Sequence, residues 1–188
     1  MTRYGTARDS AVQELLDKQA ITEIIYRYCR GLDRMDVELT LSCWHDDGTD
    51  DHGALFCGTA REFVEWLWPV HAAMERTQHT IHNILIEVDG DSAGAESYYV
   101  VYLRTNTNEG IFDIVSGGRY CDQLERRGGI WKIRHRQSVS DWVQVVPVGR
   151  LDLMLGAIPL NNPGNRTPIG MRDPSDYSYR VLKGINPG

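Results

Sequence analysis

The sequence lacks the short motifs that mark most cofactor-dependent enzymes. It has no G-x-G-x-x-G dinucleotide fingerprint, no P-loop, no G-x-S-x-G nucleophile elbow and no H-E-x-x-H zinc motif. We therefore expect a protein that uses no cofactor.

Long apolar runs and an excess of basic residues are also missing. No run approaches the roughly eighteen apolar residues that cross a bilayer, and the N-terminus has no apolar signal segment. The formal net charge of -6 and the pI near 5.5 disfavour a nucleic-acid partner, which requires a basic face. These absences predict a cytoplasmic protein with no membrane and no nucleic-acid partner.

The four cysteines show no C-x-x-C spacing: Cys29, Cys43, Cys57 and Cys121. Isolated thiols suit a reducing compartment and behave as small buried hydrophobes. We expect neither a structural disulfide nor a zinc site among them.

The first half of the chain reads as helical. Apolar spacing predicts a long helix from about Asp9 to Asp33, with a buried stripe of Val12, Leu15, Leu16, Ala20, Ile24, Ile25, Tyr28 and Leu32. Asp36 can cap a short second helix. Thr59-Ala-Arg-Glu62 is a capping box for a third helix, which Pro69 should kink or split.

The second half reads as long antiparallel strands, which gives an α+β plan with a curved sheet wrapped around helices. Asp89-Gly90-Asp91 predicts a hairpin turn before a strand at residues 95–104 that is apolar on both faces. Gly117-Gly118 marks a bulge or bend in the next strand. We expect one domain over residues 1–146, followed by a Pro/Gly-rich tail, 147–188, that packs as a lid or subunit clasp.

The segment His45-Asp-Asp-Gly-Thr-Asp-Asp-His52 contains ligands that divalent metals favour. However, it is expected to begin a strand, where neighbouring side chains point to opposite faces, and no second cluster completes a coordination shell. A solvated loop with one inward-facing group is the preferred interpretation.

A set of side chains suited to proton transfer remains: Tyr28, Asp33, His52, His79, His82 and the cation Arg136. Asp33 lies where the helix macrodipole is already negative, so the carboxylate gains nothing there from the helix. An imidazole paired with a carboxylate can act as a general base near neutral pH.

The helix ending Tyr-x-x-x-x-Asp, the Trp-x-x-Asp-Asp strand entry and the later His-x-x-His resemble the nuclear transport factor 2-like superfamily, in its polyketide-cyclase-like (SnoaL-like) group, over about Val12 to Val145. Members include scytalone dehydratase, bile acid dehydratase and hexachlorocyclohexane dehydrochlorinase. The resemblance implies a cone-shaped fold: a strongly bent mixed or antiparallel sheet, closed by three N-terminal helices around a deep pocket. It also implies an Asp–His dyad that eliminates water or HCl without metal or cofactor.

By the same resemblance, Asp33 and His82 fall at the dyad, with His79 less expected to point inward. Tyr28 matches a tyrosine of the bile acid dehydratase, and His52 stands where that enzyme has a second tyrosine. Arg136 matches an arginine of the dehydrochlorinase. We expect Asp33, His82, Tyr28 and His52 to be catalytic, and the substrate to be bound by Arg136, Tyr98, Tyr102 and Trp68.

The expected function is cofactor-independent elimination from a small hydrophobic, aromatic or polycyclic hydroxylated compound. The same acid and base would also serve an isomerase or an aldehyde-releasing carbon–carbon lyase. A non-catalytic ligand-binding protein or a dioxygenase small-subunit-like module is the alternative class. The resemblance also suggests a homodimer or homotrimer.

Overall fold

The structure, a computed structural model, describes residues 3–149 and 170–182. Within these residues the helices lie mainly in the first part of the chain and the long strands follow, which matches the expected α+β plan. The elements are α1 (Arg3–Asp33), α2 (Val37–Ser42), β1 (Trp44–Asp51), β2 (Cys57–Thr59), α3 (Ala60–Ala72), β3 (Met74–Asp89), β4 (Ser92–Thr107), β5 (Gly110–Arg127), β6 (Ile130–Pro147) and a 3-10 turn, η1 (Tyr177–Arg180).

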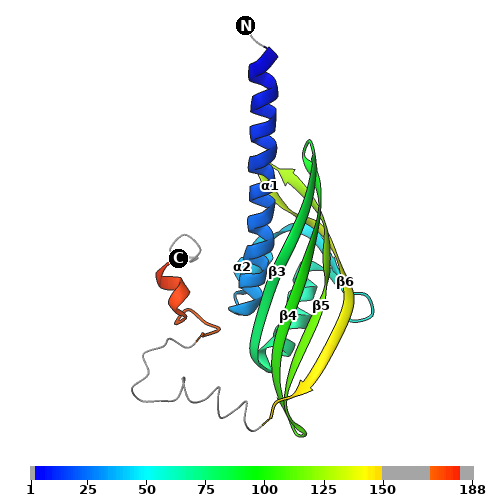
Figure 1. The fold of residues 1–188 in the computed structure, drawn as a ribbon, viewed down its shortest axis with the longest axis vertical. Coiled ribbons are helices and arrows are strands. Elements are labelled where there is room, and N and C mark those ends of the chain that lie inside the picture. Colours follow the sequence, from blue (N-terminus) through cyan, green and yellow to red (C-terminus); the bar gives the residue numbers. More distant parts are fainter. Residues whose placement is uncertain (1–2, 150–169, 183–188) are drawn as a thin grey trace.

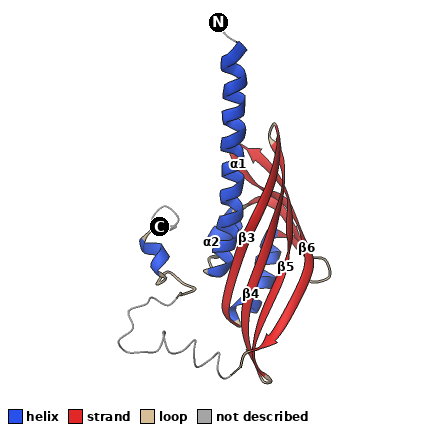
Figure 2. Ribbon diagram, viewed as in Figure 1, coloured by secondary structure: helices blue, strands red, loops and turns tan. Residues whose placement is uncertain are grey.

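The described strands form one mixed sheet with the order β2-β1-β6-β5-β4-β3. β1 runs parallel to β6, and the other neighbouring pairs are antiparallel. The sheet is strongly curved and is not closed into a barrel, and α1, α2 and α3 lie on one side of it (Figures 1 and 2). The predicted fold class, a bent sheet closed by three helices, is therefore confirmed.

Helix α1 is longer than the sequence suggested, because it begins at Arg3 instead of near Asp9. Its N-terminal half extends beyond the sheet (Figure 1), so the first part of the expected buried stripe is wrong: Val12, Leu15 and Leu16 are exposed. Burial in the apolar core starts at Ile21 and continues through the last three turns of the helix. These last turns carry the side chains that matter for the site.

The predicted helix caps are confirmed. Asp36 accepts a hydrogen bond from the backbone N–H of Leu39 at the start of α2. Thr59 and Glu62 form the reciprocal capping box of α3. Pro69 does not split α3, which continues to Ala72.

The predicted irregularity at Gly117-Gly118 is also confirmed. The pairing of β5 with β6 shifts register between these two glycines. A Cβ on Gly118 would lie 2.1 Å from the carbonyl oxygen of Val139, and one on Gly117 would lie 2.4 Å from the Trp142 ring. Only glycine fits at this close approach, where the sheet bends over its concave face.

A buried ion pair supports the centre of the concave face. The Arg136 guanidinium donates two hydrogen bonds of 2.7 Å to Asp122, and neither side chain is exposed. The same guanidinium lies 4.1 Å from the ring centroids of both Tyr28 and Tyr120. Two aromatic rings thus pack against a cation whose charge Asp122 balances.

Part of the expected tail, 147–188, is described, at residues 170–182, and it packs against the helices. Arg172 donates hydrogen bonds to the carbonyl oxygens of His71 and Met74, at 2.8 Å each. Arg30 of α1 donates to Ser178 and lies 4.8 Å from the Tyr179 ring centroid. A role as lid or clasp stays a prediction, and residues 150–169 and 183–188 lie outside the described part.

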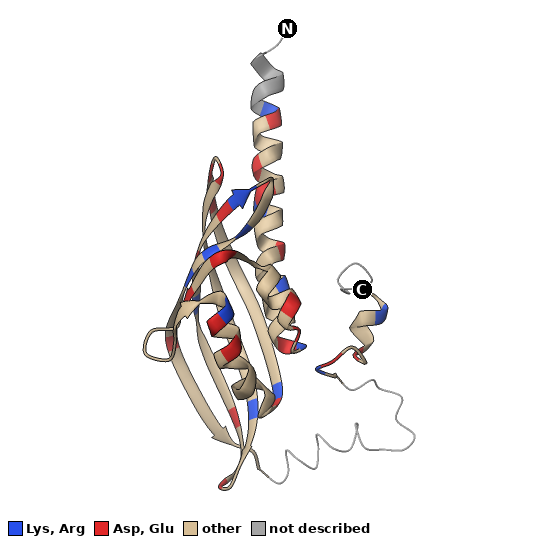
Figure 3. Cartoon of the chain, turned by 180° about the vertical axis from the view of Figure 1, so that it is seen from behind, with Lys and Arg blue, Asp and Glu red and all other residues tan. Residues whose placement is uncertain are grey.

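Acidic and basic residues are interspersed over the described helices and strands (Figure 3). Among the described helices, none is both long enough and apolar enough to cross a membrane.

We expect Asp122→Ala to lower the free energy of unfolding by about 3–5 kcal/mol, because it leaves the Arg136 charge buried without its partner. Urea unfolding at neutral pH measures this loss. Arg127→Ala, which breaks the exposed ion pair with Asp47, is the matched control and should have a much smaller effect. Equal unfolding midpoints for the two variants would contradict a supporting role for the buried pair.

Candidate active site

A cavity of about 430 Å³ lies between the helices and the concave face of the sheet. Its wall is mostly apolar and aromatic, with a few polar groups. The wall is formed by Tyr28, Leu32, His52, Leu55, Phe63, Trp66, Leu67, Val70, His71, His79, Tyr99, Val101, Leu103, Ser116, Tyr120, Ser138, Ser140 and Val143. An apolar enclosure with a few convergent polar groups is the usual form of a site for a small ligand.

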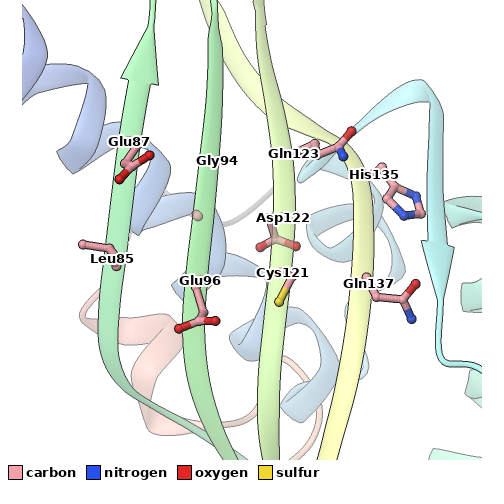
Figure 4. Close-up of a pocket in the computed structure, with 10 residues that line it drawn as sticks. Leu85, Glu87, Gly94, Glu96, Cys121, Asp122, Gln123, His135 and Gln137 are labelled. Carbon is pink, nitrogen blue, oxygen red and sulfur yellow. The ribbon is translucent and has the colours of Figure 1, made fainter.

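A second hollow, of about 530 Å³, lies on the outer face of the sheet, away from the helices (Figure 4). Its side chains include Glu87, Glu96, Cys121 and His135 on neighbouring strands. Among the described residues that line it, none belongs to the predicted catalytic set. The concave cavity is therefore the candidate active site.

Asp33 is the last residue of α1, and it pairs with His79 of β3, which lines the cavity. One carboxylate oxygen lies 2.7 Å from His79 Nδ1, and the other accepts a 2.9 Å hydrogen bond from the His79 backbone N–H. The His79 side chain is only 5% exposed. With Nδ1–H donating to the carboxylate, His79 keeps the Nε2 lone pair for another proton.

The expected pairing of Asp33 with His82 is wrong. Ile81 pairs with Tyr99 and Ile84 with Ser97, so His82 and its neighbour stand opposite a single residue of β4. This bulge shifts the alternation of side chains by one residue. His79 consequently faces inward with Asp33, and His82 is exposed.

His52 reaches the cavity as expected, and it has a carboxylate of its own. Its Nδ1 lies 2.5 Å from Asp50, whose side chain is fully buried. The imidazole stacks on Phe63, with ring centroids 4.8 Å apart and an angle of 12° between the planes. Asp50 and His52 are two residues apart, a spacing that puts both side chains on one face of a strand. The other aspartates in the same segment made this pair hard to recognise from the sequence.

Tyr28 also lines the cavity, as predicted, and its side chain is 1% exposed. Its ring packs edge-on against Trp44 and Tyr120. Burial raises the pKa of the Tyr28 phenol far above its usual value, although the nearby Arg136 charge opposes this shift. The phenol therefore stays neutral at physiological pH.

The residues expected to bind substrate do not line this cavity. Arg136 is fully buried beneath Tyr28, where Asp122 holds it. On β4, Tyr98 is exposed and the Tyr102 hydroxyl donates to Asp113, because the opposite face of that strand points inward. The inward residues are Tyr99, Val101 and Leu103, and the tryptophan of α3 at the cavity is Trp66 instead of Trp68.

His71 is a cavity residue that sequence reasoning missed. It follows Phe63 and Leu67 at four-residue intervals on the buried face of α3 and is 5% exposed. Its ring centroid lies 5.9 Å from that of His79. The detectable signal was a polar residue on the apolar face of an amphipathic helix.

Burial lowers the pKa of His71 to about 3, and the charges of His79 and Arg172 act in the same direction. A histidine in the last turn of a helix ordinarily gains from the helix dipole as a cation, but here desolvation outweighs that gain. His71 is therefore neutral near pH 7.

Within residues 3–149 and 170–182, no group of three or more His, Cys, Asp and Glu side chains is arranged to hold a metal ion. The carboxylates of Asp33 and Asp50 instead each hold one imidazole. This arrangement suits acid–base chemistry on a hydrophobic compound.

The SnoaL-like domain model matches residues 13–137. No curated protein matches the chain. Solved structures that are similar include a protein of unknown function from Mycobacterium tuberculosis, with 27% identity and a TM-score of 0.59, covering 70% of this chain and 75% of that one.

Two further similar structures come from Novosphingobium and show the fold alone. A candidate scytalone dehydratase from Novosphingobium aromaticivorans is 22% identical, with a TM-score of 0.64, and covers 74% of this chain and 98% of that one. A type 3 hexachlorocyclohexane dehydrochlorinase from Novosphingobium barchaimii is 20% identical, with a TM-score of 0.65, and covers 72% and 94%.

The low pKa of His71 predicts a pH-dependent stability. Between the folded-state pKa of about 3 and the ordinary value of 6.5, the unfolded chain binds more protons than the folded one. The stability from this group is therefore present above the ordinary value and is lost as pH falls, by up to about 1.4 kcal/mol per pH unit.

We expect His71→Gln to flatten this slope. Urea unfolding at several pH values between about 4 and 7 measures the slope for each variant. His82→Gln, which removes an exposed imidazole, is the control and should retain the wild-type slope. An unchanged slope in His71→Gln would show that His71 is not held neutral in the folded protein.

Proposed function

Since the chain belongs to the SnoaL-like domain family, we propose that it is a cofactor-independent lyase that eliminates water from a small hydrophobic, aromatic or polycyclic hydroxylated compound. The observation that carries this proposal is that His79, which lines a mostly apolar cavity, is paired with the Asp33 carboxylate. The names of two similar structures, a candidate dehydratase and a dehydrochlorinase, also point to elimination.

His79 acts as the general base in this proposal. Asp33 fixes the Nδ1–H tautomer and stabilises the imidazolium that forms when Nε2 takes a proton from carbon. The second hydrogen bond, from the His79 backbone N–H to the same carboxylate, fixes the position of the His79 backbone and so of its side chain. The mostly apolar wall of the cavity limits the water around the base.

His52 acts as the general acid. It comes from the end of β1, whereas His79 comes from β3, and the two strands lie on opposite sides of β6, β5 and β4. The two imidazoles therefore approach one cavity from opposite directions. A proton removed at one end and a proton given to a departing hydroxide at the other are the two steps that elimination requires.

Tyr28 contributes differently from the role of proton donor that its position first suggests. A buried phenol with a strongly raised pKa gives up its proton reluctantly, so it serves as a neutral hydrogen-bond donor to the substrate. The Arg136 cation beneath its ring favours this role, because it polarises the phenol without reaching the cavity.

An isomerase is the second candidate, and the paired imidazoles favour it. If one histidine removes a proton and the other returns one elsewhere, the double bond moves and no group departs. An aldehyde-releasing carbon–carbon lyase would use the same acid and base. A non-catalytic binding protein or a dioxygenase small-subunit-like module would need no Asp-held imidazole at the cavity, which makes this class less favoured.

We also propose that the protein is cytoplasmic, since its four cysteines are free thiols. A homodimer or homotrimer remains a proposal that light scattering on the purified protein tests directly.

We expect His79→Gln to lower kcat/KM by about 10²–10⁴ fold, because a general base is lost while the side-chain volume is nearly kept. Bicyclic hydroxylated compounds are incubated with the wild-type protein, and mass spectrometry detects those that lose the mass of one water. The best substrate is then used to measure the kinetics of each variant. His82→Gln is the matched control and should retain wild-type kinetics. Full activity in His79→Gln with an unchanged circular dichroism spectrum would remove the proposed base.

The acid role of His52 predicts a dependence on the leaving group. We expect His52→Phe, which keeps the stacking on Phe63, to slow the loss of hydroxide much more than the loss of chloride from a matched substrate. Chloride departs without a proton, so the acid matters little for it. An equal fall in rate for the two leaving groups would contradict the acid role of His52. A product that has taken up deuterium from the solvent but kept its hydroxyl group would favour the isomerase.

A further inference from the structure

The N-terminal half of α1 carries apolar side chains that the fold itself leaves in solvent. This half extends beyond the sheet (Figure 1), where Val12 is 47% exposed, Leu15 68% and Leu16 58%. A short projecting length of helix is only marginally stable in water, because most helical stability in proteins comes from packing an apolar face. This part of α1 therefore offers a surface for a partner.

One face of α1 has apolar residues along its middle and one charge of each sign at its two ends. Its members recur every three or four residues, so they share one side of the helix. We call it the exposed α1 face, and it consists of Asp9, Val12, Leu16, Ala20, Ile24 and Arg27. Asp9 and Arg27 are about five helical turns apart and therefore lie on one line along the helix. Ala20 and Ile24 are half-buried, and the other members are exposed.

A groove of about 280 Å³ runs along the C-terminal part of this face. Ala20, Ile24 and Arg27 line it from α1, and Ile130 and Lys132 line it from the start of β6. Ile130 is itself exposed to solvent. The exposed α1 face thus presents a projecting apolar ridge towards its N-terminal end and a groove with apolar walls towards its C-terminal end.

We propose that the exposed α1 face is a dimer interface, in which α1 of a second copy of this chain lies antiparallel along α1 of the first. Under a two-fold axis, each residue faces the residue that is equally far from position 18 on the other side. Val12 then meets Ile24 of the second copy, and Leu16 meets its Ala20. The ridge of each copy therefore fills the groove of the other.

The charges along α1 fit the antiparallel arrangement. Asp9 meets Arg27 of the second copy, and the symmetry forms this pair twice. Glu23 meets the uncharged Gln13, and Lys18 at the centre lies on the opposite side of the helix. A parallel pair of helices would instead put Asp9 beside Asp9 and Arg27 beside Arg27. Charge complementarity therefore selects the antiparallel dimer.

The single chain leaves Arg27 available for this contact. Its guanidinium is exposed and lies 3.9 Å from the Glu23 carboxylate of the same helix, and a solvent-exposed pair of this length contributes little. The interface is also separate from the proposed reaction, because the α1 residues that line the cavity, Tyr28 and Leu32, lie on another side of the helix.

The first test compares two neighbouring leucines in the full-length protein by sedimentation velocity. We expect the wild type to dimerise, and Leu16→Glu to raise the dimer Kd by about 10²-fold or more, because the symmetric interface loses a buried leucine twice. Leu15→Glu is the matched control. Leu15 is more exposed but lies about a third of a turn from the centre of the face, so its variant should keep the wild-type Kd.

Three results of this experiment would overturn the inference. They are a wild type that stays monomeric, which would leave the face for a different partner, a wild type that forms a trimer, and equal effects of Leu15→Glu and Leu16→Glu. Because both leucines are exposed in the single chain, neither variant removes a core contact. Circular dichroism checks that each variant retains its helices.

The second test reverses the charges at the ends of the face. Asp9→Arg and Arg27→Asp each place like charges opposite one another twice, and each should weaken its own homodimer by about ten-fold. A mixture of the two variants forms a heterodimer in which both facing pairs are again of opposite sign, so it should dimerise about as tightly as the wild type. Undiminished homodimers, or a mixture that stays dissociated, would overturn the antiparallel register.

Discussion

The carboxylate of Asp33 joins the end of α1 to β3, and the geometry of the cavity depends on this junction. A negative charge at the C-terminal end of a helix is unfavourable, and here the side chain is also largely buried. Two hydrogen bonds from His79, one from the backbone and one from the ring, offset that cost. One group therefore fixes both the position of the strand against the helix and the direction in which the imidazole points.

The wall of the cavity is also supported by the buried charge of Arg136, which does not line the cavity itself. Arg136 lies under the rings of Tyr28 and Tyr120, and Asp122 neutralises it from the same sheet face. The cation packs against the faces of two rings that line the cavity. A basic residue that looked like a substrate anchor is thus a buried support, because the sheet curves over it.

The sequence located the site more accurately than it assigned the partners within it. Tyr28 was placed on the buried face correctly because the apolar period of a helix fixes which face is buried. The choice between His79 and His82 failed because the bulge in β3 depends on how that strand pairs with β4. Likewise, the alternation of side chains along β4 places Tyr98 and Tyr99 on opposite faces of the sheet. It does not indicate which of these faces the helices cover.

The sequence alone determined the features that depend on a few neighbouring residues: the order of helices and strands, the caps at Asp36 and Thr59, the turn at Gly90 and the irregularity at Gly117. Only the tertiary structure decided which histidine meets Asp33, and why His71 stays neutral. Strand register and desolvation depend on atoms that come together from distant parts of the chain, so no local pattern of residues predicts them.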